Sequence, residues 1–240
     1  MVRAIYDSIY QRLRQDILNG TYPYQSLLPS ENTLIKTFSC AHNTVRKALA
    51  LLTAQGFVQP IHGKGVRVIY QPPQKTLFTL GGIETFKETA RRNHLKAQTD
   101  VVTFKTIRSD DAIAEQTGFP AGTELYYIER IRRLDGKALI FDKNYFLASI
   151  IPDLTTAIVK NSVYEYIEKT LGMRITTSKR TLTVERTTPK DERYLDVEGY
   201  DFLAVVSSQT FNSDGIMFEY TQSRHRPDYF AFHSTAIRGK

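Results

Sequence analysis

Cysteine is almost absent from this chain of 240 residues. Cys40 is the only one, so no intramolecular disulfide can form and thiolates alone cannot build a zinc site. It falls in a short break between two predicted helices, where a buried structural thiol is expected rather than a nucleophile. The histidines are scattered without the spacing of a metal-binding motif: His42, His62, His94, His225 and His233. The sequence therefore predicts no metal site and no cofactor.

Long hydrophobic runs and catalytic motifs are missing too. No stretch of 18 uncharged apolar residues occurs, which excludes a membrane-spanning helix. The first residues, MVRAIYDSIYQRL, are too polar for a secretory signal. The strings G-x-S-x-G and H-E-x-x-H and the P-loop are also absent. We therefore expect a cytoplasmic protein that is not an enzyme and has no catalytic residues.

Positive charge is concentrated at the start of the chain. Residues 1–70 hold 8 Lys and Arg against 3 Asp and Glu, a balance of +5, whereas the other 170 residues hold 24 against 22, a balance of +2. This asymmetry is typical of a protein whose N-terminal part faces a polyanion. A solvated basic surface without a partner has the same composition, so charge alone leaves both readings open.

The first 70 residues have the pattern of a small helical domain. Apolar residues recur every four positions from Ile5 to Ile17, which predicts a helix that stops before Gly20. Ser30 is placed to cap a second helix, and a third is expected over residues 43–55. A glycine-rich turn at residues 62–65 joins two short alternating segments, which predicts a hairpin.

The remainder of the chain has a different pattern. Residues 71–76, QPPQKT, predict a linker between a domain at 1–70 and a second domain at 77–240. Asp-Gly pairs at 135–136 and 214–215 predict hairpins between long alternating strands. Helical patterns fall near residues 84–93, 110–117, 162–171 and 189–196. Few strands are joined by regular crossover helices, so we expect an antiparallel α+β domain.

Three helices followed by a small hairpin are the parts of a winged helix-turn-helix, in which one helix enters the major groove of DNA. Polar residues near the start of the third helix can meet base edges and phosphates: His42, Asn43, Thr44, Arg46 and Lys47. The tip of the hairpin suits a narrow minor groove: His62, Gly63 and Lys64. Each feature alone fits any small α domain equally well, but together with the local charge they favour DNA binding.

The stretch LPSENTLIKTFSCAHNTVRKALALLTAQGFVQPIHGKG resembles the DNA-binding domain of GntR-type transcription regulators. The shared motifs are LPSE on the second helix, TVRKAL on the third, and the GKG of the hairpin. The resemblance implies that Thr44 and Arg46 contact operator DNA, with His62 and Gly63 in the wing.

Three positions depart from that family pattern. Asn32 replaces a frequent arginine or histidine, while Ala41 and His42 stand where a hydroxyl residue and an arginine usually begin the third helix. A hydroxyl cap and a guanidinium are therefore missing, and we expect His42 and Asn43 to read a different base pattern.

An arginine-rich segment stands out in the second domain. Strand alternation places Arg130 and Arg132 on one face and Arg133 on the other. Two neighbouring guanidinium groups need either carboxylate partners or a bound anion such as phosphate. Asp142 on the next strand is a candidate partner in both arrangements, and the residues by themselves favour the salt-bridged face.

Residues 77–240 resemble the effector-binding UTRA domain of the HutC branch of GntR regulators, which is similar in fold to chorismate lyase. The motifs are Gly82-Ile83-Glu84-Thr85-Phe86, Arg130-Ile131-Arg132, Asp135-Gly136, Asp142, Ser162-Val163-Tyr164 and Glu219-Tyr220. In phosphosugar-sensing members these positions hold a phosphate and a sugar. The resemblance implies a phosphate side made of Thr85, Phe86, Arg130, Arg132, Ser162 and Tyr164. It implies a sugar side made of Asp142 and Glu219.

Further strings resemble the trehalose-responsive members of this family: Phe86-Lys87-Glu88, Tyr164-Glu165-Tyr166-Ile167-Glu168, Ser223-Arg224-His225-Arg226 and Arg238-Gly239-Lys240. They imply trehalose-6-phosphate as inducer and add Lys87, Arg224 and His225 to the effector-binding residues. For Arg224 and His225, a polar solvated strand end is the alternative.

The implied protein is a homodimeric repressor of a trehalose-utilisation operon that binds a pseudo-palindromic site in double-stranded DNA. Two alternatives remain open at this point. One is a regulator that responds to another sugar or amino-sugar phosphate, and the other is a lyase-like enzyme in the second domain.

Overall fold

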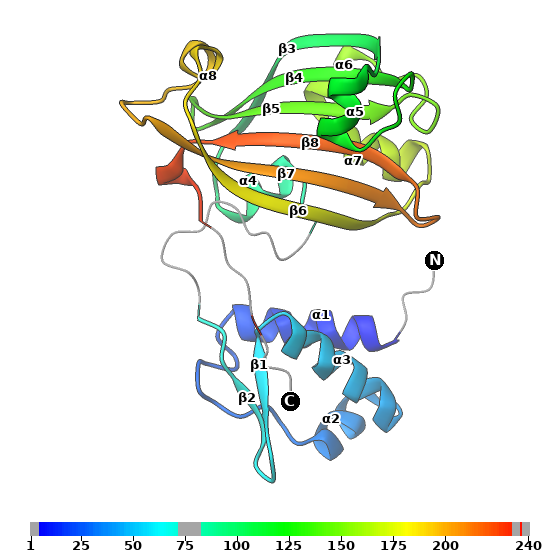
Figure 1. Ribbon diagram of the computed structural model, residues 1–240. Coiled ribbons are helices and arrows are strands. Elements are labelled where there is room, and N and C mark those ends of the chain that lie inside the picture. Colours follow the sequence, from blue (N-terminus) through cyan, green and yellow to red (C-terminus); the bar gives the residue numbers. More distant parts are fainter. Residues whose placement is uncertain (1–4, 72–82, 232–235, 237–240) are drawn as a thin grey trace. The chain divides into compact units, whose positions relative to one another are not determined.

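Two compact units divide the chain near residue 75. The computed structural model describes residues 5–71, 83–231 and 236 (Figure 1). Most of the predicted linker, 71–76, lies outside the described residues, as do Gly82 and the Arg238-Gly239-Lys240 string, so these predictions stay open.

The first unit contains three helices, α1 (Ile5–Leu18), α2 (Glu31–Phe38) and α3 (His42–Ala54). The predicted cap is present, because the Ser30 side chain accepts a hydrogen bond from the Thr33 backbone N–H. The core joins the buried stripe of α1 to Val45, Leu49 and Leu52 of α3. Ile5 departs from the expected stripe: its surface is 62% exposed, since it opens the helix beyond the reach of this core.

A two-stranded antiparallel hairpin, β1 (Val58–Ile61) and β2 (Gly65–Val68), follows the helices. Gly63 and Gly65 have φ angles of +69° and +99°, a conformation that favours glycine. Three helices and this hairpin make the predicted winged helix-turn-helix.

The second unit is built on one six-stranded sheet in which every neighbouring pair is antiparallel. The strand order is β3-β4-β5-β8-β7-β6. Both predicted Asp-Gly turns join neighbouring strands, and Asp135 and Gly136 both have positive φ angles. The strands are β3 (Ala97–Arg108), β4 (Glu124–Leu134), β5 (Lys137–Leu147), β6 (Ile175–Arg186), β7 (Phe202–Asn212) and β8 (Met217–His225).

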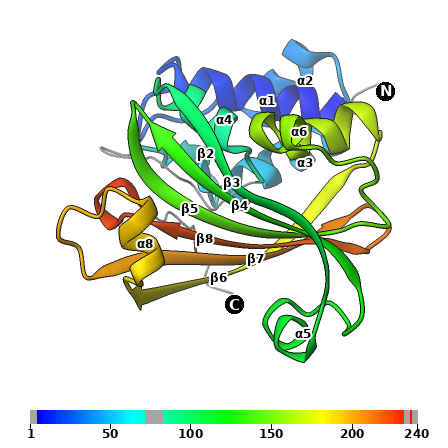
Figure 2. The ribbon, with the colours of Figure 1, turned by 90° about the horizontal axis from the view of Figure 1, so that it is seen from above.

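Short helices pack on both faces of this sheet. Figure 2 shows α4 and α6 on one side of the curved sheet. Residues of α6 and α7 join the core with Ile128 and Phe146, while Tyr194 of α8 packs against Phe141 on the opposite face. A π-helical turn, Tyr166–Thr170, continues α7, and a 3-10 turn, Pro227–Tyr229, follows β8. The helices are α4 (Phe86–Arg92), α5 (Asp111–Thr117), α6 (Thr156–Asn161), α7 (Val163–Glu165) and α8 (Pro189–Tyr194).

The predicted antiparallel α+β architecture is therefore confirmed. All four predicted helical regions contain helices, whereas α6 was not predicted.

Candidate functional site

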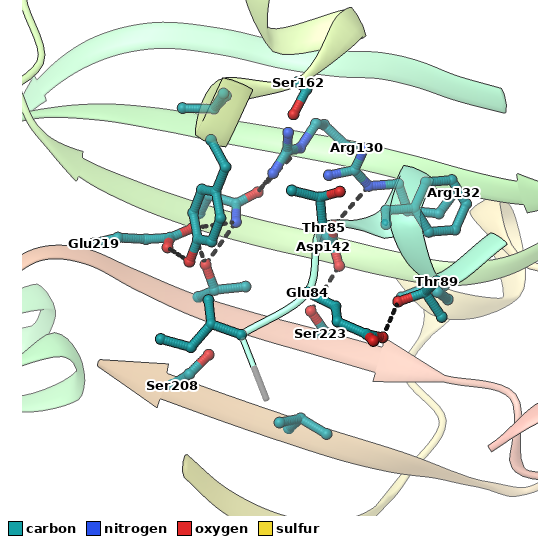
Figure 3. A pocket seen from close by; sticks show the side chains of 18 of the residues that line it. Glu84, Thr85, Thr89, Arg130, Arg132, Asp142, Ser162, Ser208, Glu219 and Ser223 are labelled. Atoms are coloured by element: carbon teal, nitrogen blue, oxygen red, sulfur yellow. Dashed lines mark hydrogen bonds and ion pairs between the residues drawn. The ribbon is translucent and has the colours of Figure 1, made fainter. Parts of the chain in front are cut away.

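A cavity of about 190 Å³ opens on the α4 face of the sheet. Its floor comes from β4, β5 and β8, and its walls from the residues before α4 and from the start of α7 (Figure 3). Ten of the predicted effector-binding residues line it: Thr85, Phe86, Lys87, Arg130, Arg132, Asp142, Ser162, Tyr164, Glu219 and His225. The structure thus brings together residues that lie more than 130 positions apart in the sequence.

The strand register decides how the floor is paired. Arg130 lies directly across from Asp142, yet Arg132, one step along the same face, takes that carboxylate with its Nε at 2.8 Å. Arg130 instead donates to the diagonal neighbour Asn144, from Nη2 at 2.8 Å and from Nε at 3.2 Å. Ser223, across from Asp142 on β8, donates to its second oxygen at 2.7 Å.

One of the two arginines is therefore salt-bridged and the other is not. Arg132 forms the expected pair with Asp142, and its guanidinium also lies over the Phe86 ring. Among the described residues, no carboxylate oxygen lies within 4 Å of the Arg130 guanidinium nitrogens, and its third nitrogen donates to the Val159 carbonyl. The salt-bridge alternative is confirmed for Arg132, which pairs with Asp142. Arg130 has no carboxylate within salt-bridge distance among the described residues, and the bound-anion alternative stays a prediction.

This arrangement shifts the pKa values of the charged residues on the cavity floor. Burial and the neighbouring Arg132 charge lower the pKa of Arg130. Burial alone would raise the pKa of Asp142, but the Arg132 and Arg130 charges lower it below its usual range. The end of the cavity that holds Arg130 and Arg132 therefore carries two positive groups and one negative group, which suits an anion.

The other end of the cavity holds the buried carboxylate of Glu219, and the charge of Arg180 acts on the same end. Glu219 accepts hydrogen bonds from the Tyr164 hydroxyl and from Thr221 Oγ1 at 2.7 Å. Burial raises the pKa of Glu219 and also that of Tyr164. Carboxylate and hydroxyl groups of this kind suit the hydroxyls of a sugar. The structure thus places Tyr164 beside Glu219 and not on the predicted phosphate side.

His225 lies on the arginine side of the cavity, across from Ile140, and burial lowers its pKa to about 4, so this side chain is neutral at pH 7. The structure also places Asp142 beside Arg132 and not on the predicted sugar side.

Two capped helix starts form the walls. Thr85 caps α4 through a capping box with Glu88, and Ser162 caps α7 by accepting from the Glu165 backbone N–H at 3.2 Å. Lys87 donates to Asn161 across the cavity wall. These contacts hold the side chains of both walls at the end of the cavity that contains the arginines (Figure 3).

Arg224 is a correction to the sequence-based assignment. It does not line the cavity, because strand alternation turns it to the opposite face from Ser223 and His225. There it pairs with Asp191 at 2.9 Å and with Glu185, and it also donates to the Arg186 carbonyl. Arg224 thus stabilises the α8 face of the sheet.

Several cavity residues were missed by sequence reasoning. Thr221 and Ser223 lie on the same face of β8 as Glu219 and His225, at every second position, so period-two spacing from Glu219 would have found them. Asn144 follows Asp142 in the same way on β5. No motif marks the contributions of β6 and β7: Ser178, Arg180, Val206 and Ser208.

In the first unit, the predicted DNA-contacting residues lie at the start of α2, at the start of α3 and on the hairpin tip. All are exposed except Thr44, which is half-buried: Asn32, Ala41, His42, Asn43, Thr44, Arg46, Lys47, His62, Gly63 and Lys64. Ala41 provides no side-chain cap for α3, as expected for a residue without a hydrogen-bonding side chain.

Glu31 connects the two helices of the motif, a role that the sequence did not suggest. One of its oxygens lies 3.1 Å from His42 Nε2 and 3.3 Å from Arg46 Nε. This carboxylate therefore orients two of the side chains that are predicted to contact DNA.

The described ranges contain neither a metal-ligand cluster nor a membrane-spanning helix. No group of His, Cys, Asp and Glu there could hold a metal ion. No helix within those ranges is both long and apolar enough to cross a membrane.

Comparison with known families identifies the class of protein. Residues 5–68 match the gntR family of bacterial regulatory proteins, and residues 92–231 match the UTRA domain. The chain belongs to the gntR family and carries a UTRA domain as its second unit. It is a DNA-binding transcription regulator with an effector domain for a small molecule, and not an enzyme.

Individual relatives sharpen this assignment. The HTH-type transcriptional regulator TreR of Bacillus subtilis (strain 168) is 36% identical over 97% of both chains. The mannosyl-D-glycerate transport/metabolism system repressor MngR of Escherichia coli (strain K12) is 25% identical over 98% of this chain and 97% of its own.

Solved structures agree with the fold. The effector-binding domain of the B. subtilis trehalose repressor is 38% identical, with a TM-score of 0.54, and covers 60% of this chain and 99% of its own. The possible regulator YydK of B. subtilis (subsp. subtilis str. 168) covers 98% of this chain and 100% of its own with a TM-score of 0.80; at 22% identity it supports the fold alone.

Proposed function

We propose that this regulator represses a trehalose-utilisation operon and leaves its operator when trehalose-6-phosphate enters the cavity. The observation that carries the proposal is the buried guanidinium of Arg130, which has no carboxylate partner within 4 Å among the described residues and lies beside a second arginine. A buried charge of this kind is costly unless an anion joins it, so a phosphate group is favoured there. The similarity to TreR supports trehalose as the sugar.

In this proposal the two ends of the cavity divide the ligand between them. Arg130, Arg132 and Ser162 face the phosphate, with Thr85, Phe86 and Lys87 on the adjoining wall. Glu219 and Tyr164 at the other end accept hydrogen bonds from sugar hydroxyls or donate to them. Asp142 and His225, which lie on the arginine side, are proposed to contact the hydroxyls nearest the phosphate. Free trehalose lacks the group that the arginine end requires, so it should bind far more weakly.

The DNA-binding end acts through α3 and the hairpin. We place α3 in the major groove, with Thr44 and Arg46 at base edges or phosphates and Lys64 of the wing in the minor groove. A homodimer would carry two such units to the half-sites of a pseudo-palindromic operator, because two-fold protein symmetry requires two-fold DNA. The protein would act in the cytoplasm, where the operon lies.

Release requires that the ligand prefers a state of the dimer that cannot hold both half-sites. Only a difference in ligand affinity between the two states can shift their populations, and such couplings are commonly about 1–3 kcal/mol. Trehalose-6-phosphate would supply that difference through the contacts of its phosphate.

A gel-shift titration on operator DNA tests the inducer. Adding trehalose-6-phosphate should release the DNA, whereas trehalose at the same concentration should leave it bound. Glucose-6-phosphate serves as the matched control, because it carries the phosphate without the second ring. Retention of the DNA at saturating trehalose-6-phosphate would refute this inducer.

The DNA interface has its own test in Arg46→Ala. Loss of this guanidinium should weaken operator binding by about 1–3 kcal/mol, and if Arg46 meets a phosphate it should also lower the salt slope by about one. Fluorescence anisotropy between 50 and 200 mM salt measures both quantities. Arg12→Ala is the control, since Arg12 pairs with Asp16 within α1. Equal losses in the two variants would contradict a specific role for Arg46.

A different phosphorylated sugar is the second candidate. The relatives include the repressor of a mannosyl-D-glycerate system, so the sugar end of the fold accepts variation within this family. A thermal-shift screen over sugar and amino-sugar phosphates discriminates the candidates, because a ligand well above its Kd raises the melting temperature.

A further inference from the structure

Asn144 lies between the two charged ends of the cavity floor. Its side chain is buried, with 1% of its surface exposed. The amide oxygen accepts both hydrogen bonds from Arg130, and the amide nitrogen donates to Thr221 Oγ1 at 2.7 Å and toward Glu219 at 3.4 Å. The two ends of one small side chain therefore contact a cation and an anion.

Only a carboxamide can make this set of contacts. A carboxylate can accept from Arg130 but cannot donate to Glu219, and an aliphatic side chain can do neither. The opposite amide orientation would aim the NH₂ group at a guanidinium and the oxygen at a carboxylate, both unfavourable. The network thus fixes the orientation as well as the identity of this side chain.

The neutral amide also leaves Arg130 without a counter-charge in direct contact. Within the described residues its guanidinium makes three hydrogen bonds to uncharged oxygens, two to Asn144 and one to the Val159 carbonyl. Asp142, the residue across the ladder, is engaged by Arg132 and Ser223. Arg130 is thereby held in place without being neutralised.

We propose that Asn144 is a positioning residue of the effector cavity, a neutral spacer that holds Arg130 in place and leaves its charge available to an anionic ligand group. The same amide separates Arg130 from Glu219, which keeps the anion end and the hydroxyl end of the cavity chemically distinct. This inference rests on the proposed function, in that the effector carries an anionic group.

The test is Asn144→Asp, which changes the shape of the side chain little and supplies the missing counter-charge. The new carboxylate would pair with Arg130 and compete with the ligand's phosphate. Calorimetric titration of the full chain with trehalose-6-phosphate should give a Kd raised at least about tenfold. Inorganic phosphate, a probe that needs no sugar, should lose its thermal stabilisation in the same variant.

Gln222→Glu is the matched control. It makes the same amide-to-carboxylate change on β8, but strand alternation places position 222 on the opposite face from Thr221 and Ser223, and it does not line the cavity. Its Kd should stay within about twofold of that of the parent chain, which separates a local effect from a change in net charge.

The pH profile separates positioning from simple distortion. The new carboxylate would lie beside Glu219, and two carboxyl groups that share a site raise the pKa of one of them. Protonation of the pair at falling pH would remove the added charge, so the ratio of variant to parent Kd should fall as pH falls. A distorted cavity would give a ratio that does not depend on pH.

The outcomes are distinguishable from those of the proposed function. If the parent chain binds inorganic phosphate but not trehalose-6-phosphate, the proposed inducer fails while a phosphate defect in Asn144→Asp still supports the spacer. If Asn144→Asp binds either probe as tightly as the parent does, the spacer role is overturned. A pH-independent Kd ratio overturns it as well.

Discussion

The two faces of the six-stranded sheet bury arginine in opposite electrostatic settings. Arg130 on the cavity face and Arg224 on the α8 face are equally buried, each with 4% of its surface exposed. Arg224 has two carboxylates, Asp191 and Glu185, within salt-bridge distance. For Arg130, the described part of the chain offers no carboxylate at that distance, only the amide of Asn144 and a backbone carbonyl.

The pKa directions follow this difference. Burial lowers the pKa of both groups, but the hydrogen bonds that Arg224 donates to Asp191 and Glu185, together with their charges, outweigh burial and raise its pKa. For Arg130, the Arg132 charge adds to burial and the pKa falls. A neutralised arginine stabilises the fold, whereas one without a counter-charge retains capacity for an external anion. Burial and residue type do not distinguish the two roles, but the number of nearby carboxylates does.

The largest expected effect is on stability, in Arg224→Met. This change would leave the carboxylate of Asp191, which is fully buried, without its ion-pair partner, and such losses cost about 3–5 kcal/mol. Urea unfolding followed by far-UV circular dichroism measures the loss.

The double variant Arg224→Met with Asp191→Asn removes both charges and should recover part of that stability. An unfolding free energy for Arg224→Met within about 1 kcal/mol of the parent would contradict a structural role for this arginine.

The contrast between the two faces of the sheet also shows which features the sequence could predict and which it could not. Asp-Gly turns and alternation predicted the β4–β5 and β7–β8 hairpins, because both signals are local. The same alternation argues against Arg224, since an odd separation from Glu219 places it on the other face. The error came from assigning Arg224 and His225 together to the effector site, although consecutive strand residues face opposite sides of a sheet.

Other features of the site are not local and could not be predicted. Which arginine forms the salt bridge with Asp142 depends on side-chain geometry across the β4–β5 pair. Arg130 is directly opposite Asp142, but Arg132 forms the bond. The role of Asn144 depends on that outcome, and so does the uncompensated charge. In the first unit, the Glu31 contact to His42 and Arg46 depends on how α2 packs on α3. The family resemblance indicated which residues gather at the cavity, but tertiary pairing determines its electrostatics.

The next largest expected effect is on effector affinity, and it compares Arg130 with Arg133. Both residues lie on β4, but they face opposite sides of the sheet. Arg130→Met should raise the Kd of trehalose-6-phosphate about a hundredfold, because charge-assisted hydrogen bonds to the phosphate are lost. The unliganded protein should stay within about 2 kcal/mol of the parent, since no carboxylate within salt-bridge distance loses a partner. Calorimetry and urea unfolding report the two quantities separately.

Arg133→Met gives the smallest effect. Its ion pair with Asp100 is partly exposed, with about a third of each side chain open to solvent, and pairs of this kind contribute less than about 1 kcal/mol. Its effector affinity should match that of the parent. If Arg130→Met destabilised the protein as much as Arg224→Met does, or Arg133→Met weakened effector binding, the electrostatic distinction between the two faces would be wrong. A small stability change joined to a large affinity change in Arg130→Met alone is the result that assigns the anion to the cavity face.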